Sequence, residues 1–276
     1  MKKLVWVVTI ALLLSACSKG EAKKEQNNDA KTITIGATAG PYSDQLKEGI
    51  APLLKEEGYE LKVVEFHDYI QPNNALEEGD IDANLYQNRL YLTNFNKEKG
   101  THLHYLFAVP SAPIALYSTT HQSLDDVKEG MTITLPNDTV NLARSLNMLQ
   151  NYGWITVNPD IDHVTVSEKD ITENPLNLVI KPLDAAATAR SLDDADFAFV
   201  NGNYAIASGL KFTEAVDVEQ TSEDFLIYLA IREGDENEDF VKALQKVYES
   251  DAFYEYTKEH AKGYVLPPYQ QEREAK

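Results

Sequence analysis

The chain has 276 residues, a formal charge of -19 and a hydrophobic share of 43%. This length is enough for one large domain or two smaller lobes, and the hydrophobic share is ordinary for a globular protein. Because so acidic a chain repels phosphate backbones and anionic lipid, nucleic acid is excluded as an expected partner.

The first residues have the pattern of a secretory signal. Lys2 and Lys3 precede an apolar run, Leu4 to Leu14, which is much shorter than the roughly 20 residues that span a bilayer. The pattern predicts a signal peptide over 1–16. Cys17, the only cysteine, follows two small residues in an order that resembles the lipobox of bacterial lipoproteins, which predicts that it carries the lipid. The alternative is ordinary cleavage before this cysteine and a soluble secreted protein.

The segment 17–31 is polar and almost free of large apolar side chains, so it predicts a flexible tether. Acyl chains on Cys17 would attach the protein to the membrane, since each buried methylene adds about 0.8 kcal/mol. We therefore expect a lipid anchor and a folded part on the extracytoplasmic face of the cell membrane.

The residues after the tether alternate strand, turn and helix. The sequence TITIGATAG predicts a strand that ends in a glycine turn, and a helix follows that Ser43 or Asp44 can cap and Gly58 ends. Pro52 should kink this helix. The sequences LKVVEF, QPNNALEEGD, IDANLY and RLYLTNFNKEKG continue as strand, helix, strand and helix. This rhythm predicts an open α/β sheet that is mostly parallel, with helices on both faces.

The same pattern starts again about a hundred residues later. TITLPNDTVNLARSLNMLQNYG predicts a strand, a turn and a helix that Gly153 ends, after a short capping-box helix at Ser123. Further apolar runs follow, and residues 239–262 predict a final helical region. Two α/β lobes explain this repetition, and ligands bind such proteins in the cleft between the lobes.

The sequence contains no catalytic constellation and no cofactor cradle. The GxSxG, HExxH and P-loop motifs are missing, and GATAG lacks the spacing of a dinucleotide fingerprint. His102 and His104 could face the same way on a strand, but no carboxylate completes a metal site there. We therefore expect a protein that is not an enzyme and that uses no metal or cofactor.

Polar residues near predicted strand ends suit ligand binding. Arg144 lies early in the helix after "PND", where it can grip a carboxylate with two parallel hydrogen bonds; the alternative is an exposed arginine paired with an acid. Asn201 or Asn203, after the strand FAFV, could bind a ligand or only close its own loop. The rings of Tyr69, Tyr86 and Tyr91 could line a pocket or pack in the core.

Several segments together resemble one family. GATAGP, VVEFHDYIQPNNAL, EEGDIDANLYQ, LPNDTVNLAR, ITENPLNL and LDDADFAFVNGNYA are similar, in order and spacing, to the NlpA/MetQ family of lipoproteins, the substrate-binding components of methionine ABC importers. The resemblance covers essentially the whole chain. It implies a two-lobed periplasmic-binding-protein type II fold with a mixed sheet in each lobe. Lobe 1 would comprise 32–112 plus 229–276, and lobe 2 would comprise 113–228.

The resemblance also implies the ligand-binding residues. Arg144 would hold the α-carboxylate, Asn201 the head group from the other side, and the aromatic rings would enclose the side chain, where a thioether makes favourable contacts. The residues placed in the cleft are Tyr69, Tyr86, Asn88, Tyr91, Asn141, Arg144 and Asn201.

The chain departs from the family pattern in the same region. Asn88 stands where the family commonly has histidine, Pro110 begins the segment that matches "HIEP" of the family, and Ile227 replaces an expected asparagine. Tyr86 replaces the usual phenylalanine. Because a buried polar group left without its partner costs about 1 to 3 kcal/mol, a changed pocket can prefer a changed ligand.

The expected function is binding of L-methionine or a related amino acid and its delivery to an ABC permease and, through it, to the ATPase. The alternatives are a receptor for another small ligand, such as a different amino acid or a methionine-containing dipeptide, and a surface adhesin lipoprotein with no role in transport.

Overall fold

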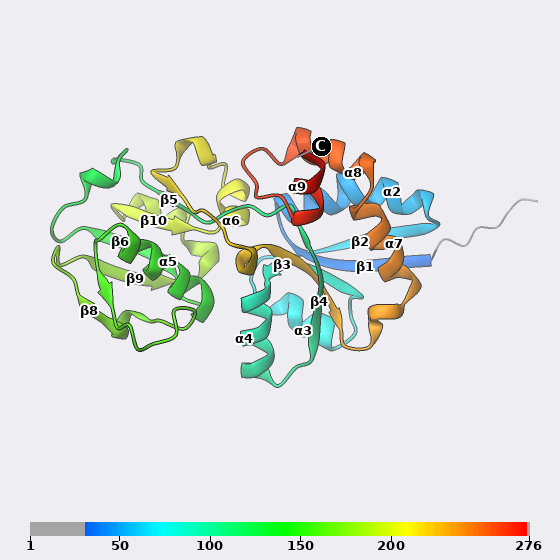
Figure 1. Cartoon of the computed structure of the whole chain (residues 1–276), viewed down its shortest axis with the longest axis horizontal. Coiled ribbons are helices and arrows are strands. Elements are labelled where there is room, and N and C mark those ends of the chain that lie inside the picture. Colours follow the sequence, from blue (N-terminus) through cyan, green and yellow to red (C-terminus); the bar gives the residue numbers. More distant parts are fainter. Residues whose placement is uncertain (1–30, 275–276) are drawn as a thin grey trace, which may run out of the picture.

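The computed structural model describes residues 31–274, which form two lobes that lie side by side along the long axis of the molecule (Figure 1). The predicted signal peptide, the lipid-bearing Cys17 and the tether up to residue 30 lie outside the described residues. Each lobe contains one five-stranded mixed sheet with helices packed against it. The expected fold class, a two-lobed α/β protein with a mixed sheet in each lobe, is confirmed.

The sheet of the first lobe has the strand order β2-β1-β3-β12-β4. Its strands are β1 (Lys31–Thr38), β2 (Tyr59–Phe66), β3 (Ala83–Asn88), β4 (Leu103–Val109) and β12 (Ile227–Arg232). β1 runs parallel to β2 and β3, whereas β12 runs antiparallel to both of its neighbours. The helices of this lobe are α1 (Pro41–Asp44), α2 (Ala51–Glu56), α3 (Gln71–Glu77), α4 (Arg89–Lys99), α7 (Asp239–Tyr248), α8 (Asp251–His260) and α9 (Pro268–Glu274).

The helix after β1 begins earlier than expected. Its N-cap is Gly40, whose φ of 99° only glycine adopts easily, and Pro41 at the first position has no N–H to satisfy. The prediction that Ser43 or Asp44 caps the helix is therefore wrong; the Ser43 hydroxyl instead donates to Gly40 O and to Glu65. A π-helical stretch, Gln45–Ile50, separates α1 from α2, and Pro52 lies in the first turn of α2; the kink expected at Pro52 itself stays a prediction.

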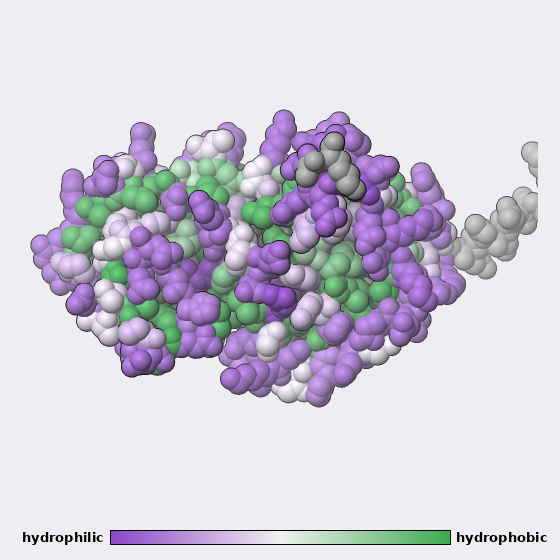
Figure 2. All heavy atoms as spheres, in the orientation of Figure 1, coloured by the Kyte–Doolittle hydropathy of each residue, from purple (hydrophilic) through white to green (hydrophobic). Residues whose placement is uncertain are grey.

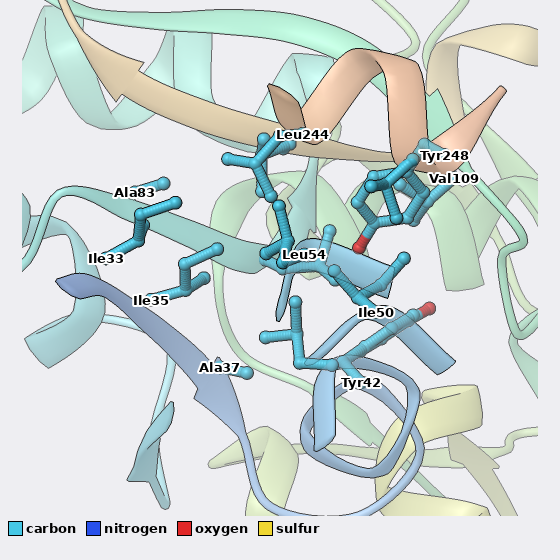
Figure 3. Close-up of a cluster of buried hydrophobic side chains, with 14 of the residues drawn as sticks. Ile33, Ile35, Ala37, Tyr42, Ile50, Leu54, Ala83, Val109, Leu244 and Tyr248 are labelled. Carbon is cyan, nitrogen blue, oxygen red and sulfur yellow. The ribbon is translucent and has the colours of Figure 1, made fainter. Parts of the chain in front are cut away.

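The core of the first lobe packs β1, β3 and β12 against the helices on one face (Figure 3). Ile33 and Ile35 project from β1, and Leu54, Leu244 and Tyr248 approach them from α2 and α7. The alternating residues of β1 that face this cluster explain the strand period seen in TITI.

The sheet of the second lobe has the order β11-β5-β10-β6-β9. Its strands are β5 (Ala115–Tyr117), β6 (Thr132–Pro136), β9 (Val179–Leu183), β10 (Phe197–Val200) and β11 (Asp217–Val218), with α5 (Thr139–Asn151) and α6 (Gly202–Ala207) as its α-helices. A separate pair is formed by β7 (Thr156–Val157) and β8 (Ile171–Glu173). The predicted capping box at Ser123 is confirmed, although the helix it begins, Leu124–Asp126, is a single 3-10 turn.

The two sheets share one connectivity. In the first sheet β1 lies between two parallel strands, and in the second sheet β6 does. The next strand beyond each parallel group, β12 or β5, follows a crossing segment from the other lobe and runs antiparallel to its neighbours. An aspartate just before the third strand accepts a hydrogen bond from the first: Asp82 from Thr34 N and Asp196 from Thr132 N, both at 2.7 Å. The repeated sequence pattern therefore corresponds to a repeated structural unit.

Two segments cross between the lobes, residues 110–114 and 219–226. Ser111, in the first segment, pairs through its backbone with Val265, and its hydroxyl accepts a hydrogen bond at 2.7 Å from the N–H of Ile227, which directly follows the second segment. Glu219 N donates to Ile114 O across the two segments. These contacts fix where the cleft-lining residues of one lobe stand relative to those of the other.

The expected helical region over 239–262 is confirmed and consists of two helices. α7 ends at Tyr248, and Ser250 begins α8 by accepting a hydrogen bond from Phe253 N. No helix within residues 31–274 has the length and apolar character to cross a bilayer. Figure 2 shows a mainly hydrophilic face with scattered hydrophobic residues.

Candidate ligand-binding site

A small cavity of about 20 Å³ lies between the lobes, room for about one water molecule. The seven residues implied by the family resemblance all line it. The full lining is Tyr42, Tyr69, Tyr86, Gln87, Asn88, Tyr91, Ala112, Asn141, Arg144, Asn201, Gly202, Asn203 and Ile227. Both lobes and the crossing segment 110–114 therefore contribute to one site.

The N-terminal turns of α5 carry two of these residues. Asp138 caps the helix by accepting from Asn141 N at 3.0 Å, and the Asn141 side-chain amide also donates to this carboxylate. Asn141 and Arg144 are three residues apart, so they lie on the same face of the helix. The cap therefore fixes the direction in which this face points.

Arg144 is buried and paired. Its side chain is 5% exposed; Nε donates to Glu219 Oε1 at 2.6 Å, and Nη2 donates to Glu219 Oε2. The sequence left open an exposed arginine paired with an acid, and Arg144 is indeed paired with an acid but is not exposed. Its Nη1 has no hydrogen bond within residues 31–274, which leaves one edge of the guanidinium for a further acceptor.

Asn201 stands where the fully buried strand β10 ends. Its side-chain nitrogen donates to Asn141 Oδ1 at 3.1 Å. Its Oδ1 is buried and has no partner among the described residues. A buried acceptor without a donor costs about 1 to 3 kcal/mol, so a ligand that brings an N–H group here would relieve this cost.

Tyrosines form the aromatic side of the cavity. The hydroxyls of Tyr86 and Tyr91 both donate to Tyr69 O, at 2.7 and 2.9 Å. The ring of Tyr69 lies 5.6 Å from that of Tyr86 and 5.8 Å from that of Tyr91. Because these hydroxyls already have backbone acceptors, the rings offer the cavity mainly apolar surface.

Two polar contacts close the lobes on each other beside the cavity. Tyr69 OH donates to Asn203 Oδ1 at 2.6 Å, and the Asn203 nitrogen donates to Thr38 Oγ1 at 3.3 Å. Asn203, which the sequence offered together with Asn201, thus bridges the second lobe to the first. The lobes must separate before a molecule as large as an amino acid can enter so small a cavity.

Burial controls the protonation of this region. It raises the pKa of Tyr69 and Tyr86 well above the usual value, so both hydroxyls stay protonated donors. Burial also raises the pKa of Asp138, while the hydrogen bonds from Asn141 act in the opposite direction.

Removing the Tyr86 hydroxyl should lower the stability of the protein by a small amount. Tyr86→Phe removes one of the two hydrogen bonds to Tyr69 O and keeps the ring, so we expect the free energy of unfolding to fall by about 0.5 to 1.5 kcal/mol. Urea unfolding of both proteins measures this difference. Tyr86→Leu is the matched comparison, because it also removes the ring and should cost more. Equal losses for the two variants would contradict the assignment of the ring to the cavity wall.

The structure adds residues that sequence reasoning missed. Tyr42, Gln87, Ala112 and Gly202 line the cavity without having been proposed. Tyr42 could have been found, because it follows the glycine turn at the carboxyl end of the first strand. Ala112 gave no chemical signal; its N–H donates to Tyr42 OH at 3.1 Å from the crossing segment 110–114.

Three of the departures from the family pattern, at Tyr86, Asn88 and Ile227, lie in the cavity wall. Asn88 caps α4 by accepting from Tyr91 N at 2.8 Å, and Ile227 is 8% exposed. The apolar Ile227 needs no hydrogen-bond partner, and Asn88 has one. The replacements are therefore accommodated without orphaned polar atoms at these two positions.

A larger cavity of about 290 Å³ lies outside the tyrosines and shares Tyr69 and Tyr91 with the first. Asp68, Asp138 and Asp184 also line it. Within residues 31–274, no group of three or more His, Cys, Asp or Glu side chains is arranged to hold a metal ion.

The comparisons with known proteins agree over nearly the whole chain. The family described as NlpA lipoprotein matches residues 33–269. The methionine-binding lipoprotein MetQ of Bacillus subtilis is 35% identical, with 97% of this chain and 99% of that protein covered. The D-methionine-binding lipoprotein MetQ of Escherichia coli is 34% identical, with 89% of each covered.

A solved structure is similar to this chain at a comparable level of sequence identity. A nutrient binding protein from Burkholderia cenocepacia bound to methionine is 36% identical, with a TM-score of 0.81, and the match covers 85% of this chain and 99% of that one. Together, the family match over residues 33–269 and these relatives establish that the chain belongs to the NlpA lipoprotein family.

Proposed function

We propose that this protein is a lipid-anchored substrate-binding protein that captures L-methionine or a closely related amino acid outside the cytoplasm and delivers it to an ABC importer. The observation that carries the proposal is that two polar groups in one buried cavity have hydrogen-bonding capacity that the protein does not use. Arg144 keeps one free donor edge, and Asn201 Oδ1 is an acceptor without a donor. An amino-acid head group supplies a carboxylate to the first and an ammonium to the second.

The remaining cavity wall suits an apolar side chain. The rings of Tyr69, Tyr86 and Tyr91 and the side chain of Ile227 present carbon surface, and sulfur makes favourable contacts with aromatic rings of about 0.3 to 1.5 kcal/mol. Relatives at 34 and 35% identity are named for binding methionine or D-methionine. These two facts together favour methionine among the amino acids.

The partners follow from the same family. Cys17 would carry acyl chains, including palmitate, that hold the protein at the extracytoplasmic face, and the polar segment after it would tether the lobes to the membrane. The closed lobes would dock on a permease, whose ATPase drives uptake. No chemical step on the ligand is part of this proposal.

A thermal-melt screen tests the ligand. The chain from Lys31 onward, freed of co-purified ligand, is melted with each L-amino acid, D-methionine and norleucine, which lacks the sulfur. At a hundredfold excess over its dissociation constant, a ligand adds about 2.7 kcal/mol of stability, so we expect methionine to raise the melting temperature by several degrees. No shift with methionine, together with a shift for another amino acid, would refute the choice of substrate but not the receptor role.

A methionine-containing dipeptide is the second candidate ligand. The observation that favours it is the larger cavity beyond the tyrosines, where Asp68, Asp138 and Asp184 could receive a distant ammonium group. Methionine dipeptides therefore belong in the same screen. A larger shift with a dipeptide than with methionine would favour this candidate, and the reverse order would exclude it as the main ligand.

A further inference from the structure

We infer that Glu219 is a positioning residue for the ligand site. It binds the Nε and Nη2 edge of the Arg144 guanidinium and neutralises its charge. As a result, the site selects a zwitterion over a simple anion. This inference rests on the proposed function for its ligand and on the Arg144–Glu219 pair for its geometry. Glu219 does not line the small cavity, so it acts through the arginine.

The pair is built as a rigid support. Glu219 takes the Nε and Nη2 edge of the guanidinium, which is the edge nearest the side-chain stem. The Thr221 hydroxyl donates to Glu219 Oε2 at 2.8 Å, and the Phe225 ring lies 4.4 Å from Arg144 Cζ. These three supporting residues come from the crossing segment 219–226, whereas Arg144 comes from α5. The crossing segment therefore sets the plane and direction of the guanidinium.

Two cavities share this arginine as a lining residue. Arg144 lines both the small cavity and a second one of about 480 Å³, whereas Glu219 and Phe225 line only the second. Glu219, which occupies the Nε and Nη2 edge, is therefore not part of the wall of the small cavity. The Nη1 end, which has no partner within residues 31–274, is the part that remains to meet a ligand carboxylate.

The charge of the pair determines what this edge can accept. The side chains of Arg144 and Glu219 are 5% and 11% exposed, so water screens their charges little. Glu219 cancels the positive charge that a lone arginine would present. A bare carboxylate would gain little attraction here, whereas an amino acid also brings its own compensating ammonium to Asn201 Oδ1.

The first experiment compares two ligands that differ only in the ammonium group. L-Methionine and its desamino analogue, 4-(methylthio)butanoate, are titrated by calorimetry into the wild-type protein and into Glu219→Gln. We expect the ratio of the two affinities, which favours methionine in the wild type, to fall at least tenfold in Glu219→Gln. Glu214→Gln is the matched control, because it removes the same charge from an exposed pair with Lys211 in the same lobe and should leave the ratio unchanged.

The second experiment needs no ligand. Glu219→Gln is introduced into the wild type and into Arg144→Met, and the four melting temperatures are compared. We expect the substitution to lower the melting temperature of the wild type, because it breaks the pair. In the Arg144→Met background it should raise the melting temperature, because it removes a buried carboxylate that has lost its cation.

The outcomes separate this inference from the proposed function. A lower melting temperature in both backgrounds would mean that Glu219 has only a local structural role, and an unchanged affinity ratio would mean that it does not set the charge preference; either result overturns the inference. A wild-type protein that binds no methionine would instead defeat the proposed function, and the melting comparison would still decide whether Glu219 holds Arg144.

Discussion

Arg144→Ala is expected to weaken methionine binding at least a hundredfold and to lower the free energy of unfolding by about 3 to 5 kcal/mol. The binding loss follows because the alanine removes the only guanidinium that lines the cavity within residues 31–274. The stability loss follows because Glu219, 11% exposed, would keep its charge without a partner. Calorimetric titration well below the melting temperature measures the first effect, and urea unfolding measures the second.

Two comparison variants make this result specific. Arg144→Lys keeps the charge but loses the forked geometry, so its affinity should lie between those of the wild type and the alanine variant. Arg89→Ala removes an arginine that is paired with Asp224 but is 35% exposed and lines neither cavity, so it should cost about 1 kcal/mol or less. Unchanged methionine affinity in Arg144→Ala would remove the carboxylate role from this residue.

Gly202→Ala is the second substitution with a large expected effect. A Cβ at Gly202 would stand 2.5 Å from Pro113 O and 2.6 Å from Ala112 Cβ, so it would push the crossing segment 110–114 away from α6. Overpacking of this kind costs about 1 to 3 kcal/mol, and more where the neighbour is backbone. Since Ala112 and Asn201 both line the cavity, we also expect methionine affinity to fall about tenfold.

Gly49→Ala is the matched control for this prediction. Gly49 also lies in a helical segment with negative φ, and its Cβ would meet the Tyr256 ring at 2.8 Å. A ring can turn aside more cheaply than a crossing segment can shift, so this variant should lose less stability and should keep its ligand affinity. Equal affinity for methionine in Gly202→Ala and in the wild type would show that the packing of α6 on the crossing segment does not set the site.

The sequence predicted those elements whose signals are local. The strand and helix around TITLPND were recognised because Asp138 caps α5 and Gly153, with a φ of 74°, follows its end. The helix start at Gly40 was misassigned, because Ser43 and Asp44 have the composition of a cap but lie inside the helix. The helical region over 239–262 was predicted without its division, which falls where α7 ends at Tyr248 and Ser250 caps α8.

The residues of the candidate site also fall into those that the sequence predicts and those that it does not. The resemblance carried over residues that follow strands or open helices, such as Asn201 and Arg144, and the structure brings them together around one cavity. Glu219 was out of reach, because it lies 75 residues from Arg144 in a segment without a motif. The contact between Tyr42 and Ala112 was out of reach for the same reason, because 70 residues separate the two. Such partners depend on how the crossing segments pair, which no local pattern encodes.

The position of β12 also determines the order in which the lobes can be completed during synthesis. β12 lies between β3 and β4, so residues 103–109 have no neighbouring strand in their sheet until residues 227–232 have been made. The second sheet is assembled from strands between residues 115 and 218 and needs nothing beyond them. The middle part of the chain can therefore complete its sheet before the first lobe does, while β3 keeps an open edge that is exposed to mispairing.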